Sequence, residues 1–327
     1  MTQAPMTQAT HAMLPAAAAG QAPLPQLEGS LARIGRHLPI EAASARSAIT
    51  EVLGPVLATR WPALATRFSV LTNTGLPVEL AWASADEAVR WTAEVGPPEL
   101  PESARAGVAA HVARHLTGAD IDVHPWRALQ RGQRLRYGCW LGVRHRGTDR
   151  AAKLYVELPA PRAEAVPVPP DGIAVLLTCG RLVDDAVWRM AGLNADGTVE
   201  LYARAPRLDD EALACLATLL PERRPLLDAV ARLLPVPGLP RPSGFSITLD
   251  QRGAVVALTW FCFAKSIWGD DARACRALRS HAGSPGSLAL YDELAQGAPD
   301  GRWRHSMVGA GCDAGGRAWV QAGLRPT

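Results

Sequence analysis

The chain has 327 residues, of which 48% are hydrophobic and 20% are charged, a balance typical of a soluble globular protein with a sizeable core. Its formal net charge of +3 is too small to indicate nucleic acid or an acidic membrane surface as a partner. The longest apolar stretch, at residues 254–264, is far shorter than the roughly 20 residues of a membrane-spanning helix, so no span is expected.

The first residues predict a tail that precedes a single domain. Residues 1–26 are rich in Ala, Pro, Gln and Thr and carry little charge, which is typical of a flexible segment and not of a signal peptide. Residues 27–327 are expected to form one domain. The six cysteines are scattered, and no two lie at CxxC spacing, which favours reduced thiols and a cytoplasmic location.

Strand-like runs then come in five pairs, each turned by the Gly, Asn or Asp residues that hairpins require. The pairs are residues 67–71 and 77–84 with 88–95, residues 134–145 with 152–158, residues 186–193 with 198–203, residues 244–249 with 254–264, and residues 302–309 with 317–324.

Helical patterns mostly separate these pairs. Helices are expected at residues 27–38, 42–57, 102–116, 209–220, 223–234, 270–281 and 287–294. Asp209 and Asp270 suit the start of a helix. Residues 159–170 are rich in proline and cannot form one helix.

A helix after every second strand argues against a parallel sheet, which needs a crossover after every strand. Ten antiparallel strands can instead close into a barrel, an α+β fold without exposed sheet edges. Polar and apolar residues alternate along the strands, so that Lys153, Tyr155 and Glu157 share one face. The helices can cover the apolar face, and the polar face is therefore expected to point into a lumen. The alternative is an open sheet with helices on one face and water on the other.

Several of these strands resemble a known family. Two consecutive runs resemble the first hairpin of the ABBA-fold aromatic prenyltransferases, in particular of their dimethylallyltryptophan synthase branch. The runs are Leu71-Thr72-Asn73-Thr74-Gly75-Leu76-Pro77-Val78-Glu79-Leu80-Ala81-Trp82 and Val89-Arg90-Trp91-Thr92-Ala93-Glu94. The Lys-x-Tyr strand of that branch resembles Lys153-Leu154-Tyr155, and a second such strand is expected at Glu200-Leu201-Tyr202. The family architecture, five α-β-β-α units in a PT barrel, matches roughly residues 30–327.

The resemblance implies transfer of a dimethylallyl or longer prenyl group from an allylic diphosphate to an indole or phenol by electrophilic aromatic substitution. It implies no cofactor and no metal. By motif, Glu79 would bind the aromatic acceptor, Arg90 and Lys153 would bind diphosphate, and Tyr155 and Tyr202 would shield the allylic cation.

One position departs from the family pattern, because Glu200 stands where the family has a cation. A carboxylate repels a diphosphate. Arg204 is the nearest candidate for a replacement charge, and others are Arg136, Arg189, Lys265 and Arg304.

Two alternative functions remain possible for this sequence. A barrel that has lost catalysis could bind a hydrophobic small molecule, and a prenyltransferase could act on aromatic side chains of a peptide. Neither Asp184-Asp185 nor Asp270-Asp271 has the third acid of a motif that binds magnesium diphosphate. The sequence leaves the acceptor, the prenyl length and the oligomeric state open.

Overall fold

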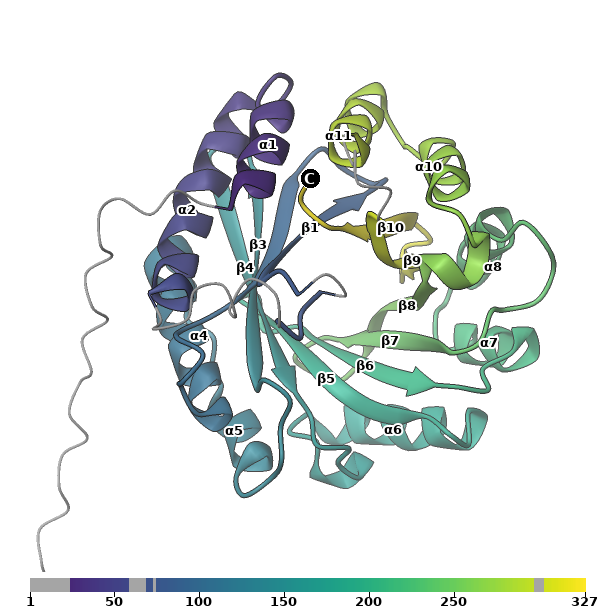
Figure 1. The fold of residues 1–327 in the computed structure, drawn as a ribbon. Coiled ribbons are helices and arrows are strands. Elements are labelled where there is room, and N and C mark those ends of the chain that lie inside the picture. Colours follow the sequence, from purple (N-terminus) through teal and green to yellow (C-terminus); the bar gives the residue numbers. More distant parts are fainter. Residues whose placement is uncertain (1–23, 59–68, 73–74, 297–302) are drawn as a thin grey trace, which may run out of the picture.

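The chain forms a closed ring of antiparallel strands, as the hairpin pattern predicts (Figure 1). The computed structural model describes residues 24–58, 69–72, 75–296 and 303–327. The strands are β1 Val78–Ala83, β2 Val89–Glu94, β3 Cys139–Arg146, β4 Asp149–Glu157, β5 Val187–Asn194, β6 Val199–Ala205, β7 Ser243–Leu249, β8 Val255–Phe263, β9 His305–Asp313 and β10 Ala318–Leu324. Each pairs with its neighbours in the sequence, and β1 pairs with β10 to close the barrel.

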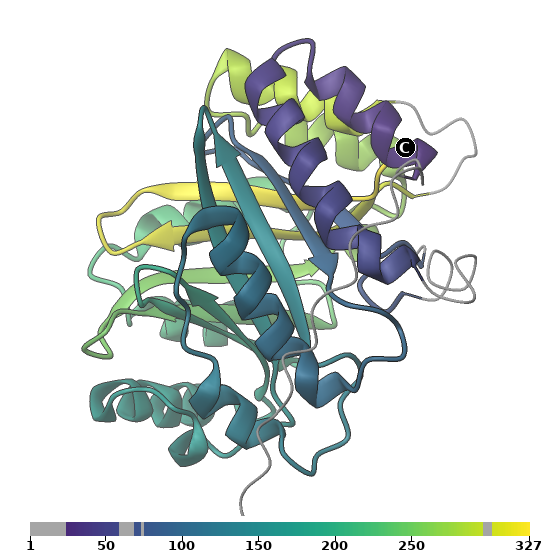
Figure 2. The same ribbon diagram turned by 90° about the vertical axis from the view of Figure 1, so that its left-hand side faces the viewer.

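Helices surround the strands on the outside of the ring (Figure 1). They are α1 Pro25–Ile34, α2 Pro39–Leu57, α4 Glu102–Thr117, α5 His124–Gln130, α6 Pro170–Leu182, α7 Asp210–Ala217, α8 Arg224–Leu233, α9 Ala264–Trp268, α10 Asp271–Arg279 and α11 Pro285–Ala295, with a 3-10 turn, η1, at Ala163–Ala165. Helix α2 packs on β2, α4 on β3 and β4, α8 on β9 and β10, and α11 on β1. Figure 2 shows α2 and α4 lying across the outer face of the barrel.

The structure corrects several sequence-based expectations. Of the strand expected at residues 67–71, residues 67 and 68 lie outside the described part, and residues 69–71 form no strand. Helix α6, which begins at Pro170, the last residue of the proline-rich segment, was not anticipated, and neither were the short helices α5 and α9. Of the tail expected at residues 1–26, residues 1–23 lie outside the described part, and Pro25 and Gln26 belong to α1.

Buried aromatic residues occupy the side of the strands that faces the helices. Trp82 on β1 donates its indole N–H to the backbone oxygen of Ser287 in α11, at 2.9 Å. Trp91 on β2 donates to Nε2 of His145, at 2.9 Å, and Nδ1 of His145 lies 2.9 Å from the hydroxyl of Ser44 in α2. Burial lowers the pKa of His145 to about 4, so the ring stays neutral and can accept the hydrogen bond from Trp91. These bonds attach the helices to the barrel wall.

Glycines on the opposite, lumen-facing side make room for large side chains of adjacent strands. A Cβ atom at Gly244 of β7 would lie 2.4 Å from the ring of Phe261 on β8. A Cβ atom at Gly311 of β9 would lie 2.5 Å from the ring of Trp319 on β10. The aromatic rings therefore lie along the inner wall, over positions that have no side chain.

Thr327, three residues beyond the end of β10, is attached to α1. Thr327 accepts hydrogen bonds from Arg33 of α1 at its backbone oxygen (3.0 Å) and at its hydroxyl (2.7 Å). Its backbone N–H donates to the hydroxyl of Ser30, at 2.9 Å. Figures 1 and 2 show the C-terminus beside α1.

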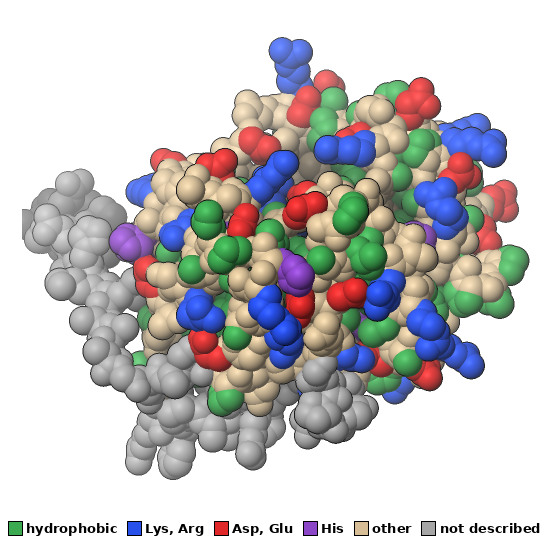
Figure 3. All heavy atoms as spheres, turned by 90° about the horizontal axis from the view of Figure 1, so that it is seen from above, with side chains coloured by type: hydrophobic (Ala, Val, Ile, Leu, Met, Phe, Trp, Pro, Cys, Tyr) green, Lys and Arg blue, Asp and Glu red, His purple; other side chains and the backbone are tan. Residues whose placement is uncertain are grey.

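The outer surface of the barrel shows no area of one charge sign on the face drawn in Figure 3, where acidic and basic side chains are interspersed. All six cysteines are free thiols. Within the described residues, no helix combines the length and the hydropathy that crossing a membrane requires.

The packing of the lumen wall can be tested at Gly244. We expect Gly244→Ala to lower the free energy of unfolding by about 1–3 kcal/mol, because the added Cβ atom overlaps Phe261 and the backbone oxygen of Ala203. Gly180→Ala in α6 is the matched control, since that site is open, and alanine should stabilise the helix by about 0.5–1 kcal/mol. Urea denaturation measures both changes, and equal effects at the two sites would contradict the close packing at Gly244.

Candidate functional site

The candidate residues lie on the strand faces that turn away from the helices. They are Glu79 on β1, Arg90 on β2, Lys153 and Tyr155 on β4, and Glu200, Tyr202 and Arg204 on β6. On each of these strands the intervening residues are buried, while the candidates are partly or fully exposed. The alternation that was read from the sequence therefore places them on the lumen side of the wall.

An ion pair between Lys153 and Glu200 lies at the centre of this group. The two residues are on strands separated by β5, and the aliphatic part of Lys153 crosses that strand at Gly192. A Cβ atom at Gly192 would lie 2.3 Å from Cε of Lys153. Glu200 also accepts a hydrogen bond from the hydroxyl of Ser246 on β7, at 2.5 Å. The absence of a side chain at Gly192 is therefore what allows the cation and the carboxylate to meet.

Aromatic rings lie beside this ion pair. The Nζ atom of Lys153 is 5.3 Å from the ring centroid of Tyr155 and 5.6 Å from that of Tyr202, within the range of a cation–π contact. The rings of Tyr155 and Tyr202 are 6.1 Å apart, and Phe261 lies another 6.1 Å beyond Tyr202. A positive charge already occupies the aromatic site, so the arrangement suits a cationic group chemically.

The ion pair sets the protonation states of the cluster. Burial alone would lower the pKa of Lys153, but the Glu200 carboxylate outweighs it and the pKa is raised. Burial would raise the pKa of Glu200, but the charge of Lys153 and hydrogen bonds from Lys153, Ser246 and Tyr202 lower it. Burial, followed by the charge of Glu200, raises the pKa of the Tyr202 phenol well above its usual value. At neutral pH Lys153 and Glu200 are charged and Tyr202 is not.

Glu79 lies on a different part of the wall and has no cation as a partner among the described residues. Its carboxylate accepts a hydrogen bond from Ser306, and a Cβ atom at Gly323 of β10 would lie 2.9 Å from it. Burial raises the pKa of Glu79 to about 7, although the bond from Ser306 opposes the shift. This carboxyl group can therefore lose or take up a proton near neutral pH.

The strand register gives the relation between Glu79 and Lys153. Glu79 pairs with Thr92, Thr92 with Gly142, and Gly142 with Lys153. The two residues thus lie in one row that crosses three strand spacings, about 14 Å along the wall. The small residues Thr92 and Gly142 lie between them, and the ring of Tyr155 leans over Gly142.

Arg90 forms an ion pair that the sequence analysis did not predict. Its guanidinium group binds Asp86, in the β1–β2 turn, through two bonds of 2.6 and 2.5 Å. Burial would raise the pKa of Asp86, but the hydrogen bonds and the charge of Arg90 lower it. Both cations that were assigned to diphosphate binding therefore carry a bound carboxylate in this structure.

The additional cations lie away from the ion pair. Arg204 is exposed near the end of β6, and Lys265 is exposed in α9. Arg304 binds Asp271 of α10, at 2.7 Å, which places it on the helix side of the wall. Arg304 is therefore not a lumen cation, contrary to the sequence-based suggestion.

Three contacts of the site were missed in the sequence: Ser246 on Glu200, Phe261 beside Tyr202, and Ser306 on Glu79. The alternation of polar and apolar residues in β7 and β8 was the available signal for the first two, since it puts them on the same face as Gly244. Ser306 follows the buried His305 at the start of β9, where the β9–β10 register shifts, and its position could not be read from alternation.

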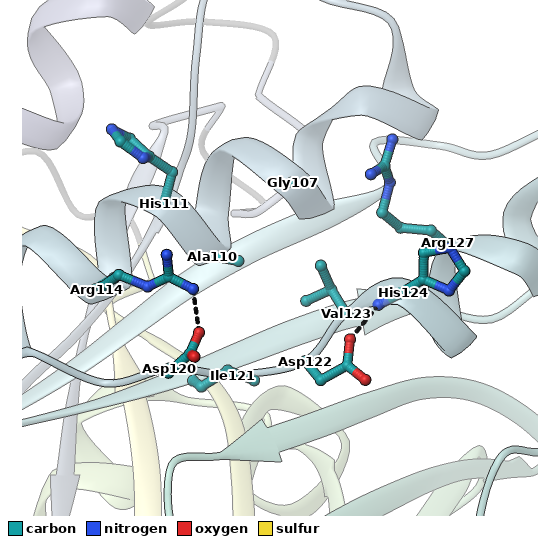
Figure 4. A pocket seen from close by; sticks show the side chains of 10 residues that line it. All are labelled: Gly107, Ala110, His111, Arg114, Asp120, Ile121, Asp122, Val123, His124 and Arg127. Carbon is teal, nitrogen blue, oxygen red and sulfur yellow. Dashed lines mark hydrogen bonds and ion pairs between the residues drawn. The ribbon is translucent and has the colours of Figure 1, made fainter. Parts of the chain in front are cut away.

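Two other polar clusters lie outside the lumen. One is an open surface pocket of about 430 Å³ between α4 and residues 120–127. Figure 4 shows that Arg114 bonds to Asp120 there and that the backbone N–H of His124 bonds to Asp122. The second cluster brings together a carboxylate, a thiol and an imidazole that the sequence analysis did not connect, from Asp271, Cys275 and His305. The Asp271 carboxylate already accepts bonds from His305 and Arg304, so this cluster acts as a link between α10 and β9.

No family model and no curated protein matches the sequence. The 5-dimethylallyltryptophan synthase from Streptomyces coelicolor has a similar structure, with a TM-score of 0.70 and 15% identity over 92% of this chain and 96% of that chain. PriB, solved with product diphosphate, gives a TM-score of 0.70 and 16% identity over 92% and 95%. AnaPT from Neosartorya fischeri gives 0.68 and 13% over 93% and 95%. The chain thus has the ABBA barrel fold of the dimethylallyltryptophan synthases, which confirms the fold that the sequence resemblance implied.

Proposed function

We propose that this chain transfers a prenyl group, dimethylallyl or longer, from an allylic diphosphate to a small aromatic ring such as an indole or a phenol. The observation that carries the proposal is the cluster of Lys153, Tyr155 and Tyr202 inside the barrel. The shared fold supports it, since PriB has been solved with tryptophan and dimethylallyl thiolodiphosphate.

The aromatic rings suit the cationic stage of such a reaction. Departure of diphosphate leaves an allylic cation, which water would capture. Tyr155, Tyr202 and Phe261 form an arc of π-faces that can stabilise the cation and exclude water. Lys153 lies against two of these rings, and we propose that it holds the departing diphosphate close to the cation that it leaves.

Glu79 suits the acceptor side of the reaction. A carboxylate that accepts an indole N–H or a phenol O–H raises the electron density of the ring. A pKa of about 7 makes the ionised form available near neutral pH and gives the group a useful basicity. Glu79 is also about 14 Å along the wall from Lys153, and we propose that the acceptor ring lies between them.

The two ion pairs favour a second candidate function. A diphosphate must compete with Glu200 for Lys153 and with Asp86 for Arg90. If neither carboxylate yields, the barrel would bind an uncharged aromatic or prenyl-like molecule without catalysing transfer. This second candidate retains the aromatic arc but gives the cations a structural role.

An activity assay separates the two candidates. The protein is incubated with dimethylallyl or geranyl diphosphate and a panel of indoles and phenols, and products are read by mass spectrometry. We expect a prenylated aromatic product. The acid pairs noted in the sequence are engaged outside the lumen, with Asp185 bound to Arg207 and Asp270 capping α10, so the activity should persist in EDTA. Binding of the aromatic compounds without any product would favour the second candidate.

Lys153→Ala tests the diphosphate site. A charge-assisted contact is typically worth about 1.5–3 kcal/mol, so the affinity for dimethylallyl thiolodiphosphate should fall roughly 10- to 150-fold. Arg131→Ala removes an exposed cation outside the barrel and serves as the control, with an affinity close to that of the wild type. Titration calorimetry measures both variants. An unchanged affinity in Lys153→Ala would remove Lys153 from the diphosphate site.

Glu79→Gln tests the titrating carboxyl group. Turnover of the wild type should rise with pH through about 7 as Glu79 loses its proton, whereas the variant should be slower and lack this step. Between its ordinary pKa of 4.5 and about 7 the folded state holds a proton that the unfolded state has lost, so the stability of the wild type relative to Glu79→Gln should fall by about 1–3 kcal/mol as the pH rises from 4.5 to about 7 and should level off above that. Rate–pH profiles and urea denaturation at several pH values measure the two effects. If the rate and the stability of the two proteins changed with pH in the same way, Glu79 would not titrate in this pH range.

A further inference from the structure

Glu200 faces a closed set of groups in the described part of the lumen. These are Lys153 and Tyr155 from β4, Gly192 from β5, its own strand neighbour Tyr202, and Ser246 and Thr248 from β7. Among them only Lys153 is cationic, and Asp196 in the β5–β6 turn adds a further negative charge near Lys153. Lys153 and Glu200 therefore neutralise each other before any ligand arrives, and Asp196 leaves the surroundings negative.

An arriving diphosphate breaks this balance, because it takes Lys153 as its counter-ion and lies beside the Glu200 carboxylate. Two negative groups that share one cation in a partly buried site repel each other strongly. Ser246 holds one oxygen of Glu200, and Lys153 lies over Gly192 and pairs with the other oxygen, so the carboxylate is bonded on two sides. Taking up a proton removes the repulsion without moving the strand.

A protonated Glu200 would also change its role toward the ligand. A carboxylic acid has an O–H donor that a carboxylate lacks. The acid can donate a hydrogen bond to a phosphate oxygen, and Ser246 can stay bonded to its second oxygen. A neutral acid would thus contribute a donor at a position where Glu200 in its ionised form contributes only repulsion.

We propose that this barrel binds an allylic diphosphate together with one proton from solvent, and that Glu200 in its acid form donates a hydrogen bond to the diphosphate. The proposal rests on the function proposed above. It makes the affinity of the barrel for the allylic diphosphate depend on pH. Glu200 is ionised in the free protein and protonated in the complex, so the affinity should increase as the pH falls. For one linked proton the limit is about tenfold per pH unit.

The test is isothermal titration calorimetry of the full chain with dimethylallyl thiolodiphosphate, at one pH, in buffers that differ in ionisation enthalpy. The dependence of the observed heat on the buffer gives the number of protons taken up. Glu200→Gln cannot take up a proton at this position. Protons that the ligand itself takes up on binding are counted equally in both proteins, so the variant is the control. We expect the wild type to take up about one proton more than Glu200→Gln. We also expect the variant to bind more tightly than the wild type above about pH 7, and the difference to shrink as the pH falls.

The outcomes separate this inference from the proposed function. Binding by both proteins with equal proton uptake would overturn the role of Glu200 and leave prenyl transfer standing. No binding by either protein at any pH would overturn both. Binding by the wild type that weakens as the pH falls would also contradict the proposal.

A second measurement does not depend on the folding of Glu200→Gln. Infrared difference spectra of the Glu79→Gln variant, recorded on addition of dimethylallyl thiolodiphosphate, report the appearance of a protonated carboxyl group. Glu79 is absent from this variant, so it cannot supply the signal. A new carboxylic acid band supports protonation of Glu200. A complex with dimethylallyl thiolodiphosphate that lacks this band contradicts it.

Discussion

The alternation of side chains along ten closed strands is the constraint on which the rest of the structure depends. Because the ring has no edge, each residue of a strand either packs under the helices or faces the lumen. Trp82 and Trp91 occupy the outer side and hydrogen-bond to neighbours there, which leaves polar residues for the inner side. A slip of one residue in any strand would bring its charged groups under the helices, so the packing of the outer layer also sets the chemistry of the inner one.

The lumen has a different kind of order, because small and large residues complement each other across strands. Lys153 extends over Gly192 and Phe261 lies over Gly244, so glycine determines the direction in which each long side chain runs. In this way residues on strands that do not pair directly, such as Lys153 and Glu200, come into contact. Backbone positions without side chains are as important to the cluster as the charged residues.

The sequence predicts the ring well because its signals are local. Turns such as residues 250–253 and the alternation of residues 152–158 lie within short windows. It predicts helix α6 poorly, since four prolines precede that helix and its first turns carry Ile173 and Val175, which are as typical of strands. It cannot predict that Glu200 binds Lys153, because this pair depends on how the strands stagger and on which residue leaves space. Asp86 lies only four residues before Arg90, and this local signal was not used. The identity of the lumen residues follows from the pattern, but their ionic partners do not.

The seam between β1 and β10 has a consequence for the synthesis of the chain. Leu80 and Leu324 pair across this seam, and almost the whole described sequence lies between them. The hairpins made earlier can pair with one another as they leave the ribosome, whereas β1 must keep an unpaired edge until β10 appears. The cost of closing so long a loop falls on this final pairing, which makes it the slow step expected for a fold rich in distant contacts. Through that interval an open strand edge could pair with another nascent chain. The pairing of β1 with β10 removes this edge, and Thr327, which follows β10, then bonds to α1.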